Sequence, residues 1–136
     1  MCADIYVFDA DQEMVECCAC KVPANAVLRL SLKNQLIQRP LTGQVVTAGA
    51  IFIVGDRYPG CNETVPRPIS DLLATKVQVQ LAGDPNAPTP WLSETNFQSV
   101  PLTADQQNFL ALGCAFTQYL GNKIKGKCIC GLQPGS

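Results

Sequence analysis

The chain of 136 residues contains no histidine and little charge. The lack of histidine excludes Ser-His-Asp and Cys-His nucleophile systems, histidine-based metal sites and haem with a histidine ligand. Charged residues make up 15% of the chain, whereas about 25% is usual. The net charge of −1 leaves little repulsion between copies. Because there is no basic excess, we expect no nucleic-acid partner.

Long apolar runs are also missing. None reaches the ~18 residues of a membrane helix, so we expect no membrane span. Met1 is followed at once by Cys2, Ala3 and Asp4, without the basic region and apolar core of a signal peptide. Since a cysteine-rich chain suits export, we expect the mature form of a secreted protein. A lipoprotein is not expected, because its lipidated cysteine would be residue 1.

Cysteine, by contrast, is abundant. The eight cysteines are Cys2, Cys17, Cys18, Cys20, Cys61, Cys114, Cys128 and Cys130. This number predicts disulfides and an oxidising, extracellular location. Because alternate residues of a strand share a face, Cys18 and Cys20 should point together and Cys17 away from them. Two C-x-C strands side by side could form two parallel bridges, but eight cysteines allow about a hundred connectivities and the sequence does not decide among them.

A metal site is the alternative use of the clustered cysteines. It would draw on Cys17, Cys18, Cys20, Cys128 and Cys130. Structural zinc sites prefer a spacing of two to four residues between ligands, and C-C-x-C with C-x-C departs from it. Free redox thiols are a third reading. We therefore expect disulfides, with no metal and no cofactor.

Alternating apolar residues and turn residues divide the chain into short segments. The predicted strands are 3–8, 14–22, 26–32, 45–54, 75–81, 91–100 and 124–131. In the first, Ile5 and Val7 face one way and Tyr6 and Phe8 the other, so both faces need cover. In 26–32 the leucines are expected to point inward. In 75–81 the apolar residues occupy one face.

The one convincing helix is predicted at about 103–120. Thr103 and Gln106 form a capping box, and Phe109, Leu112 and Phe116 recur at helical spacing, so we expect this face to pack on a sheet. Together, the predicted strands and helix indicate a mainly β fold: a disulfide-reinforced β-sandwich of six to seven short strands with one C-terminal helix. The whole chain, 1–136, is expected to be a single secreted domain.

The first third of the chain resembles a family of uncharacterised secreted bacterial proteins. The resemblance rests on the C-A-D-I-Y-V-F start, the C-C-A-C cluster at 17–20, the Leu30-Ser31-Leu32 strand and the late cysteine pair. It is fairly specific over 2–42 and weak over 45–101. Asp4 stands where asparagine is usual in that family. The resemblance implies export and no particular activity.

Paired carboxylates are the only other candidates for chemistry. Asp9 and Asp11 lie in a predicted turn, where aspartate hydrogen-bonds the backbone, and Glu13 and Glu16 follow. Calcium binding is the alternative for Asp9 and Asp11, but the motif is too short for a complete calcium loop. The sequence does not exclude a glycosidase pair, although nothing points to one.

Three further features suggest surface roles. Asn62 begins an N-x-T sequon, a triplet that is common by chance. Trp91 is expected to pack in the core or at a strand edge, and the less favoured alternative is that it forms a sugar-binding platform. Residues 57–60 could form a contact loop.

These features favour a structural protein rather than an enzyme. We expect a self-assembling extracellular or cell-surface subunit, a homo-oligomer or polymer such as a filament, without a small-molecule substrate. The candidate assembly strand consists of Ile5, Tyr6, Val7 and Phe8, which a neighbour's open sheet could bury. The same strand could instead lie in the centre of the chain's own sandwich. The alternative function is a monomeric secreted binding or inhibitor domain that uses loops 57–68 and 84–90.

Overall fold

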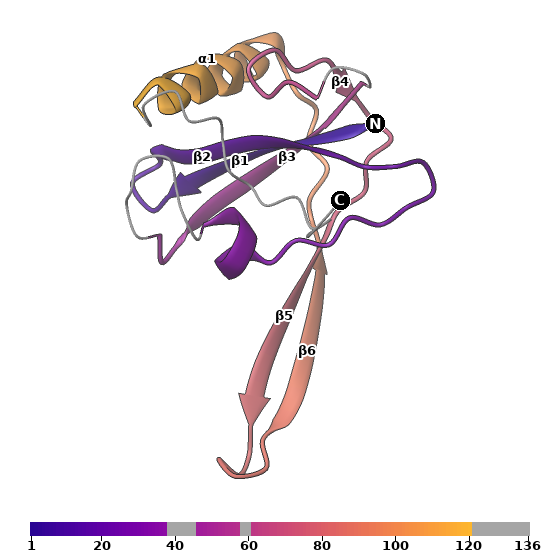
Figure 1. Ribbon diagram of the computed structural model, residues 1–136, viewed down its shortest axis with the longest axis vertical. Coiled ribbons are helices and arrows are strands. Elements are labelled where there is room, and N and C mark those ends of the chain that lie inside the picture. Colours follow the sequence, from indigo (N-terminus) through magenta and orange to yellow (C-terminus); the bar gives the residue numbers. More distant parts are fainter. Residues whose placement is uncertain (38–45, 58–60, 121–136) are drawn as a thin grey trace.

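The computed structural model of the chain describes residues 1–37, 46–57 and 61–120 (Figure 1). The predicted class is confirmed. The described residues are mainly β, with six strands in two antiparallel sheets, one C-terminal helix and disulfide reinforcement. The elements are β1 (Cys2–Asp9), β2 (Met14–Lys21), the π-helical turn η1 (Leu32–Leu36), β3 (Gly49–Asp56), β4 (Pro68–Ile69), β5 (Thr75–Ala82), β6 (Thr89–Asn96) and α1 (Ala104–Leu120). The predicted strand 124–131 lies outside the described residues.

The larger sheet has the strand order β2-β1-β3-β4, and all its pairs are antiparallel. The first strand of the chain is therefore central. Ile5 lies between Cys18 on one side and Ile53 on the other. Every residue of β1 from Cys2 to Phe8 is buried, as expected for a strand that is apolar on both faces.

Each face of this sheet has its own core. On one face, Ile5 and Val7 pack with Cys18 and Cys20 and with residues of the segment that ends in η1. On the other, Tyr6 and Phe8 pack with Cys17 and with α1 through Leu110 and Cys114. Figure 1 shows α1 on one side of the sheet and η1 on the other. The predicted orientation of the cysteine cluster, with Cys17 opposed to Cys18 and Cys20, is confirmed.

The predicted strand 26–32 is wrong. Residues 27–31 form no regular element, and Leu32 begins η1 with its side chain 46% exposed. The physical reason is a cap: the Ser31 hydroxyl accepts from the Asn34 amide at 3.2 Å, and the Ser31 amide donates to Gln35 Oε1 at 2.6 Å. This pair begins a helical turn in place of a strand. Leu28 and Leu30 still pack against the core.

The helix is confirmed, but its predicted packing face is wrong. Gln106 N donates to Thr103 Oγ1 at 3.2 Å, and Thr103 N donates to Gln106 Oε1 at 3.0 Å, which is the expected capping box. The residues that α1 buries are Leu110, Cys114 and Thr117. The residues expected to pack, Phe109, Leu112 and Phe116, are instead more than 60% exposed.

A disulfide explains the orientation of the helix. Cys17 of β2 is bonded to Cys114 of α1, with 5.7 Å between the Cα atoms. The Thr117 hydroxyl lies 3.3 Å from the Met14 carbonyl oxygen, and a side chain at Gly113 would crowd Met14. The covalent bond therefore turns the Leu110–Cys114–Thr117 face toward the sheet and leaves the more apolar face outside.

The second sheet is a single hairpin, β5–β6, which projects from the rest of the molecule (Figure 1). All sixteen of its strand residues are exposed. We call residues 75–96 the arm and the rest of the described chain the body. The face of the body's sheet opposite η1 is covered by α1 and not by the arm.

Candidate functional site: the arm, two apolar surfaces and a buried carboxyl pair

The arm has two chemically different faces. Its register pairs Val79 with Leu92 and Leu81 with Pro90, so these side chains share a face with Val77. Val77 pairs with Glu94, so one carboxylate lies at the base of this face. We call Val77, Val79, Leu81, Pro90 and Leu92 the apolar face of the arm. The opposite face carries mainly polar residues together with Trp91. The predicted alternation in 75–81 is confirmed, but the apolar side chains have no cover: Val79 is 60% exposed and Leu92 is 72% exposed.

Hydrogen bonds close the arm at both ends. At its base, Phe97 N donates to the Ala74 carbonyl oxygen at 3.0 Å. At its tip, Asp84 Oδ1 accepts from Asn86 N at 2.9 Å, and the Asp84 carbonyl oxygen accepts from Ala87 N at 3.0 Å. Among the described residues, β5 and β6 pair only with one another. A two-stranded hairpin of this kind is marginal in water unless something covers it.

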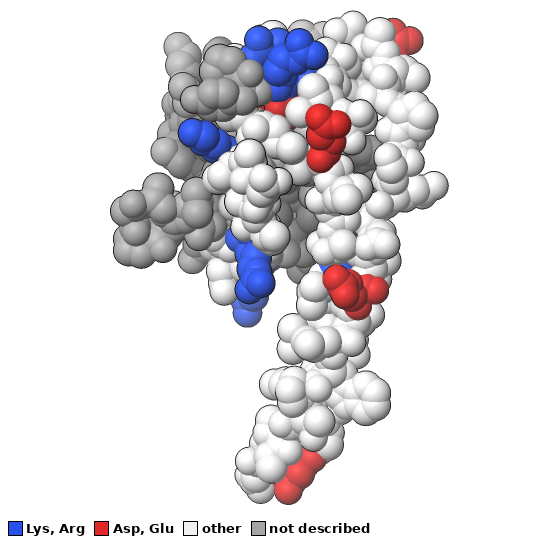
Figure 2. All heavy atoms as spheres, turned by 90° about the vertical axis from the view of Figure 1, so that its right-hand side faces the viewer, with Lys and Arg blue, Asp and Glu red and all other residues white. Residues whose placement is uncertain are grey.

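Charge is sparse on the arm. Lys76, Asp84 and Glu94 are its only charged residues. Figure 2 shows a largely uncharged surface, with acidic groups at the tip and where the arm leaves the body. A surface with so few charges offers little electrostatic obstacle to association with another uncharged surface.

A second exposed apolar surface lies on α1. We call Phe109, Leu112, Phe116, Tyr119 and Leu120 the outer face of α1, because helical spacing puts them on one side of the helix and each is more than half exposed. The Phe109 ring stacks on Phe8 with centroids 6.1 Å apart, and Phe52 meets Phe8 edge-on at 5.6 Å. The exposed aromatic surface thus continues from α1 onto β3.

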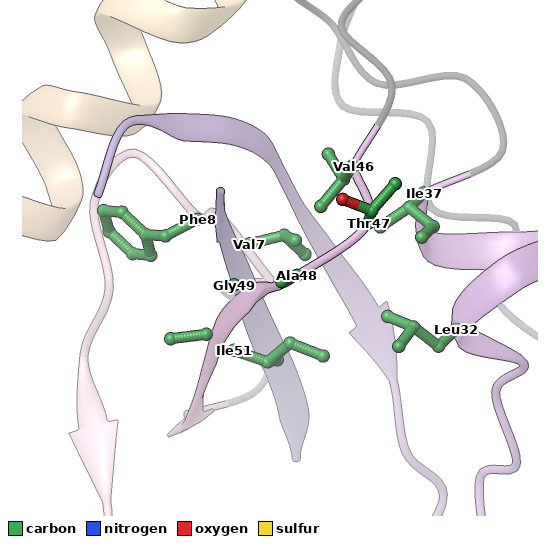
Figure 3. A pocket seen from close by; sticks show the side chains of 10 residues that line it. Val7, Phe8, Leu32, Ile37, Val46, Thr47, Ala48, Gly49 and Ile51 are labelled. Carbon is green, nitrogen blue, oxygen red and sulfur yellow. The ribbon is translucent and has the colours of Figure 1, made fainter. Parts of the chain in front are cut away.

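The third feature is a small apolar cavity of about 90 Å³ beside the start of β3. Figure 3 shows Val46, Ile37 and Leu32 around it, with Val7 and Ile51 from the sheet. Thr47 supplies the one polar side chain among the described residues that line it. A cavity of this size and lining suits a single aliphatic group and offers no titratable side chain.

The body also contains two buried aspartates that the sequence analysis did not identify as a pair. Asp4 of β1 and Asp56 of β3 have no exposed surface, and strand alternation places both on the face of the sheet that carries Tyr6 and Phe8. Asp56 Oδ1 accepts from the amides of Arg57 and Arg67, each at 2.7 Å, and Oδ2 accepts from Asn62 N at 3.4 Å. A carboxylate that receives three backbone amides is well stabilised.

Asp4 has the opposite environment. As a carboxylate it finds no donor for either oxygen, whereas as a neutral acid it can donate its proton to Asp56 beside it. Burial, followed by the charges of Asp56 and Glu63, raises the pKa of Asp4 to about 8. Asp4 is thus a neutral acid at mildly acid pH. Since no solvent reaches the pair, it has the features of a structural element rather than of a catalytic site.

Burial also raises the pKa of the Tyr6 phenol, and the nearby carboxyl groups add to this shift. The Tyr6 hydroxyl donates to the Glu63 carbonyl oxygen at 2.8 Å, while the Glu63 side chain accepts from Gln118 of α1 at 2.6 Å. These bonds tie the loop after Cys61 to the sheet and to the helix. No group of three or more metal-ligating side chains occurs in residues 1–37, 46–57 and 61–120.

The predicted disulfides are present wherever the structure describes the cysteines. Cys2 is bonded to Cys61, with 5.3 Å between the Cα atoms, and Cys17 to Cys114. Cys18 and Cys20 are also in disulfides. Cys17, Cys18 and Cys20 are therefore not the thiolates that the alternative metal site requires. Cys128 and Cys130 lie outside the described residues.

The candidate assembly strand is placed in the chain's own sheet. Ile5, Tyr6, Val7 and Phe8 are buried and paired with both β2 and β3. This is the alternative in which the strand completes its own fold. In this arrangement the segment presents neither a free edge nor a free face to a neighbour.

Of the smaller features, the turn at Asp9 is confirmed, because Asp9 Oδ1 accepts from the amides of Asp11 and Glu13 at 2.9 Å. Asn62 is exposed, and its side chain accepts from the Thr64 amide and hydroxyl. The expected core packing of Trp91 is wrong, since this side chain is 66% exposed on the arm. Residues 58–60 of the expected contact loop lie outside the described residues.

Within the part of the chain that the structure describes, no helix has the length and hydrophobicity needed to cross a membrane. Comparisons of the chain with protein-family models, with curated proteins and with solved structures gave no match.

Proposed function

We propose that this protein is an extracellular structural subunit that assembles with copies of itself into a filament or surface polymer. The observation that carries this proposal is the arm, whose strands are exposed on both faces and apolar on one. A hairpin with this composition gains stability when another surface covers its apolar face. Assembly supplies that cover.

The disulfides support an extracellular location. The two complete pairs close long segments of chain, with a sequence separation of 59 for Cys2 and Cys61 and of 97 for Cys17 and Cys114. Such bonds persist in oxidising compartments and are rare in the reducing cytosol. The resemblance of residues 2–42 to secreted bacterial proteins favours the same location.

The arm replaces the N-terminal strand as the proposed site of assembly. Donation of β1 would break its pairing with two strands and expose both cores of the body. Use of the arm costs none of these contacts, because the arm is already outside the body. An assembly through a preformed, projecting element therefore requires no unfolding.

The test is to excise the arm. Since Phe97 N donates to the Ala74 carbonyl oxygen, a two-residue Asn-Gly turn can replace residues 75–96 without moving the body. Native full-length protein should form regular polymers in negative-stain electron microscopy and elute as large species in size-exclusion chromatography. The excised variant should stay monomeric. A full-length protein that remains monomeric at high concentration, or an excised variant that forms the same polymers, would refute the proposal.

One observation favours a second candidate function, a secreted binding or inhibitor domain. The tip of the arm, part of the predicted contact loop 84–90, is exposed and is held in shape by Asp84. A fixed, projecting tip is a suitable contact for a different protein. This function would be supported by a monomeric full-length protein that binds one partner and loses that binding when Asp84→Ala loosens the tip.

A further inference from the structure

We infer that the apolar face of the arm binds the outer face of α1 of a second copy, so that copies associate head to tail. This inference rests on the proposed function and names the receiving surface. Figure 1 shows the arm and α1 at opposite ends of the molecule. The two surfaces of one copy therefore do not meet each other, while those of successive copies can.

The two surfaces match in length. The apolar face of the arm runs from Val77 to Leu81, about 14 Å at ~3.4 Å per strand residue. The outer face of α1 runs from Phe109 to Leu120, about 16 Å at ~1.5 Å per helical residue. A helix laid along a small sheet is a common way to bury one apolar face of each element.

The surfaces also match in size, and both are largely uncharged. Each consists of five exposed apolar residues, and a side chain of this size presents on the order of 100 Å² when it is more than half exposed. Together they would bury roughly 1,000 Å², close to the ~1,200 Å² at which stable interfaces begin, before any polar rim is added. Each surface carries one carboxylate, Glu94 beside Val77 on the arm and Asp105 one turn before Phe109 on α1, and both lie at an end of their surface, so the central part of the contact is uncharged.

Two other surfaces could contact the apolar face of the arm, but each would leave exposed apolar residues uncovered. Contact between two arms would close a dimer and leave the outer face of α1 exposed on both copies. The cavity beside β3, at about 90 Å³, would take one side chain and leave most of the arm uncovered. Contact between the arm and α1 covers both surfaces, and it repeats at each copy to give an open polymer.

A complementation experiment tests this inference. Val79→Glu places a charge in the apolar face of the arm, and Phe116→Glu places one in the outer face of α1. Both side chains are at least 60% exposed, so both variants should fold, which circular dichroism would verify. Each variant alone should be monomeric at a concentration at which the wild type polymerises. An equimolar mixture should form a one-to-one dimer, because the intact arm of one variant meets the intact helix of the other.

Two matched control variants introduce the same glutamate charge outside the two proposed contact surfaces. Gln78→Glu lies on the other face of β5, and Ala115→Glu lies on an exposed flank of α1. Both should polymerise like the wild type. Polymers from Phe116→Glu alone would overturn the inference but leave the proposed function intact. Dimers of Phe116→Glu alone, with no mixed dimer, would point to arm–arm contact and overturn it too. A wild type that never assembles would overturn both.

Discussion

β1 and β5 are both strands of eight residues with alternating side chains, yet they lie in opposite environments. β1 is paired along both edges, covered on both faces and connected to distant parts of the chain by Cys2. β5 has one pairing partner among the described residues, and all eight of its residues are exposed. The body thus satisfies its own apolar surface, whereas the arm presents apolar surface that a single copy does not cover.

The largest expected effect is on the body. Replacement of both Cys17 and Cys114 by alanine opens a segment of 97 residues and should lower the free energy of unfolding by about 4 kcal/mol. Urea denaturation followed by far-ultraviolet circular dichroism would measure this. Fluorescence is unsuitable, because the one tryptophan, Trp91, lies in the exposed arm. A loss below about 1 kcal/mol would mean that the bond does not hold α1 to the sheet.

The second prediction concerns the pH dependence of the body. Burial raises the pKa of Asp4 from 3.8 in the unfolded chain to about 8. Between these values the folded protein holds a proton that the unfolded chain has lost, so stability is greatest near pH 4 and falls as the pH rises to about 8. The fall attributable to Asp4 should be on the order of 3–5 kcal/mol.

Asp4→Asn tests this directly. The amide cannot ionise and can donate a hydrogen bond to Asp56, so the variant should be more stable than the wild type at pH 8 and should lose most of the dependence on pH. Asp11→Asn, at an exposed turn position, is the control and should keep the wild-type profile. Equal slopes for the wild type and Asp4→Asn would show that Asp4 does not cause the pH dependence.

A third comparison lies within α1. Leu110→Ala should cost about 2–4 kcal/mol, because it leaves a cavity against Tyr6 and Phe8, whereas Phe116→Ala should cost less than about 1 kcal/mol. Thermal or urea unfolding of the two variants in parallel measures the difference. The reverse order would restore the packing face that the sequence alone predicts.

The helix shows why sequence reasoning succeeded in part. Its start follows from a local cap, which Thr103 and Gln106 supply within four residues. Its packing face depends on a bond between Cys114 and Cys17, and the sequence allows too many pairings to find that bond. Apolar periodicity identifies the most apolar face of a helix, and in α1 that face is the exposed one.

The same distinction applies to the strands. Alternation in β1 and β5 correctly predicts which side chains share a face, because that follows from backbone geometry. It does not predict what covers each face, since cover comes from elements far away in the sequence or from another molecule. Among the candidate sites, the cysteines were therefore found from the sequence, while the exposed arm and the Asp4–Asp56 pair were not.

The smallest expected effect isolates the difference between the two strands with one substitution. Val7→Thr puts a hydroxyl into the core of the body and should cost about 1–3 kcal/mol, because the buried group lacks an assured partner. Val79→Thr makes the same change on the exposed arm and should alter the free energy of unfolding of the monomer by less than about 0.5 kcal/mol. If the arm assembles as proposed, Val79→Thr should nevertheless raise the concentration needed for polymers, measured by light scattering. An arm valine that is as sensitive as Val7 in the monomer would show that the arm folds back onto the body in solution.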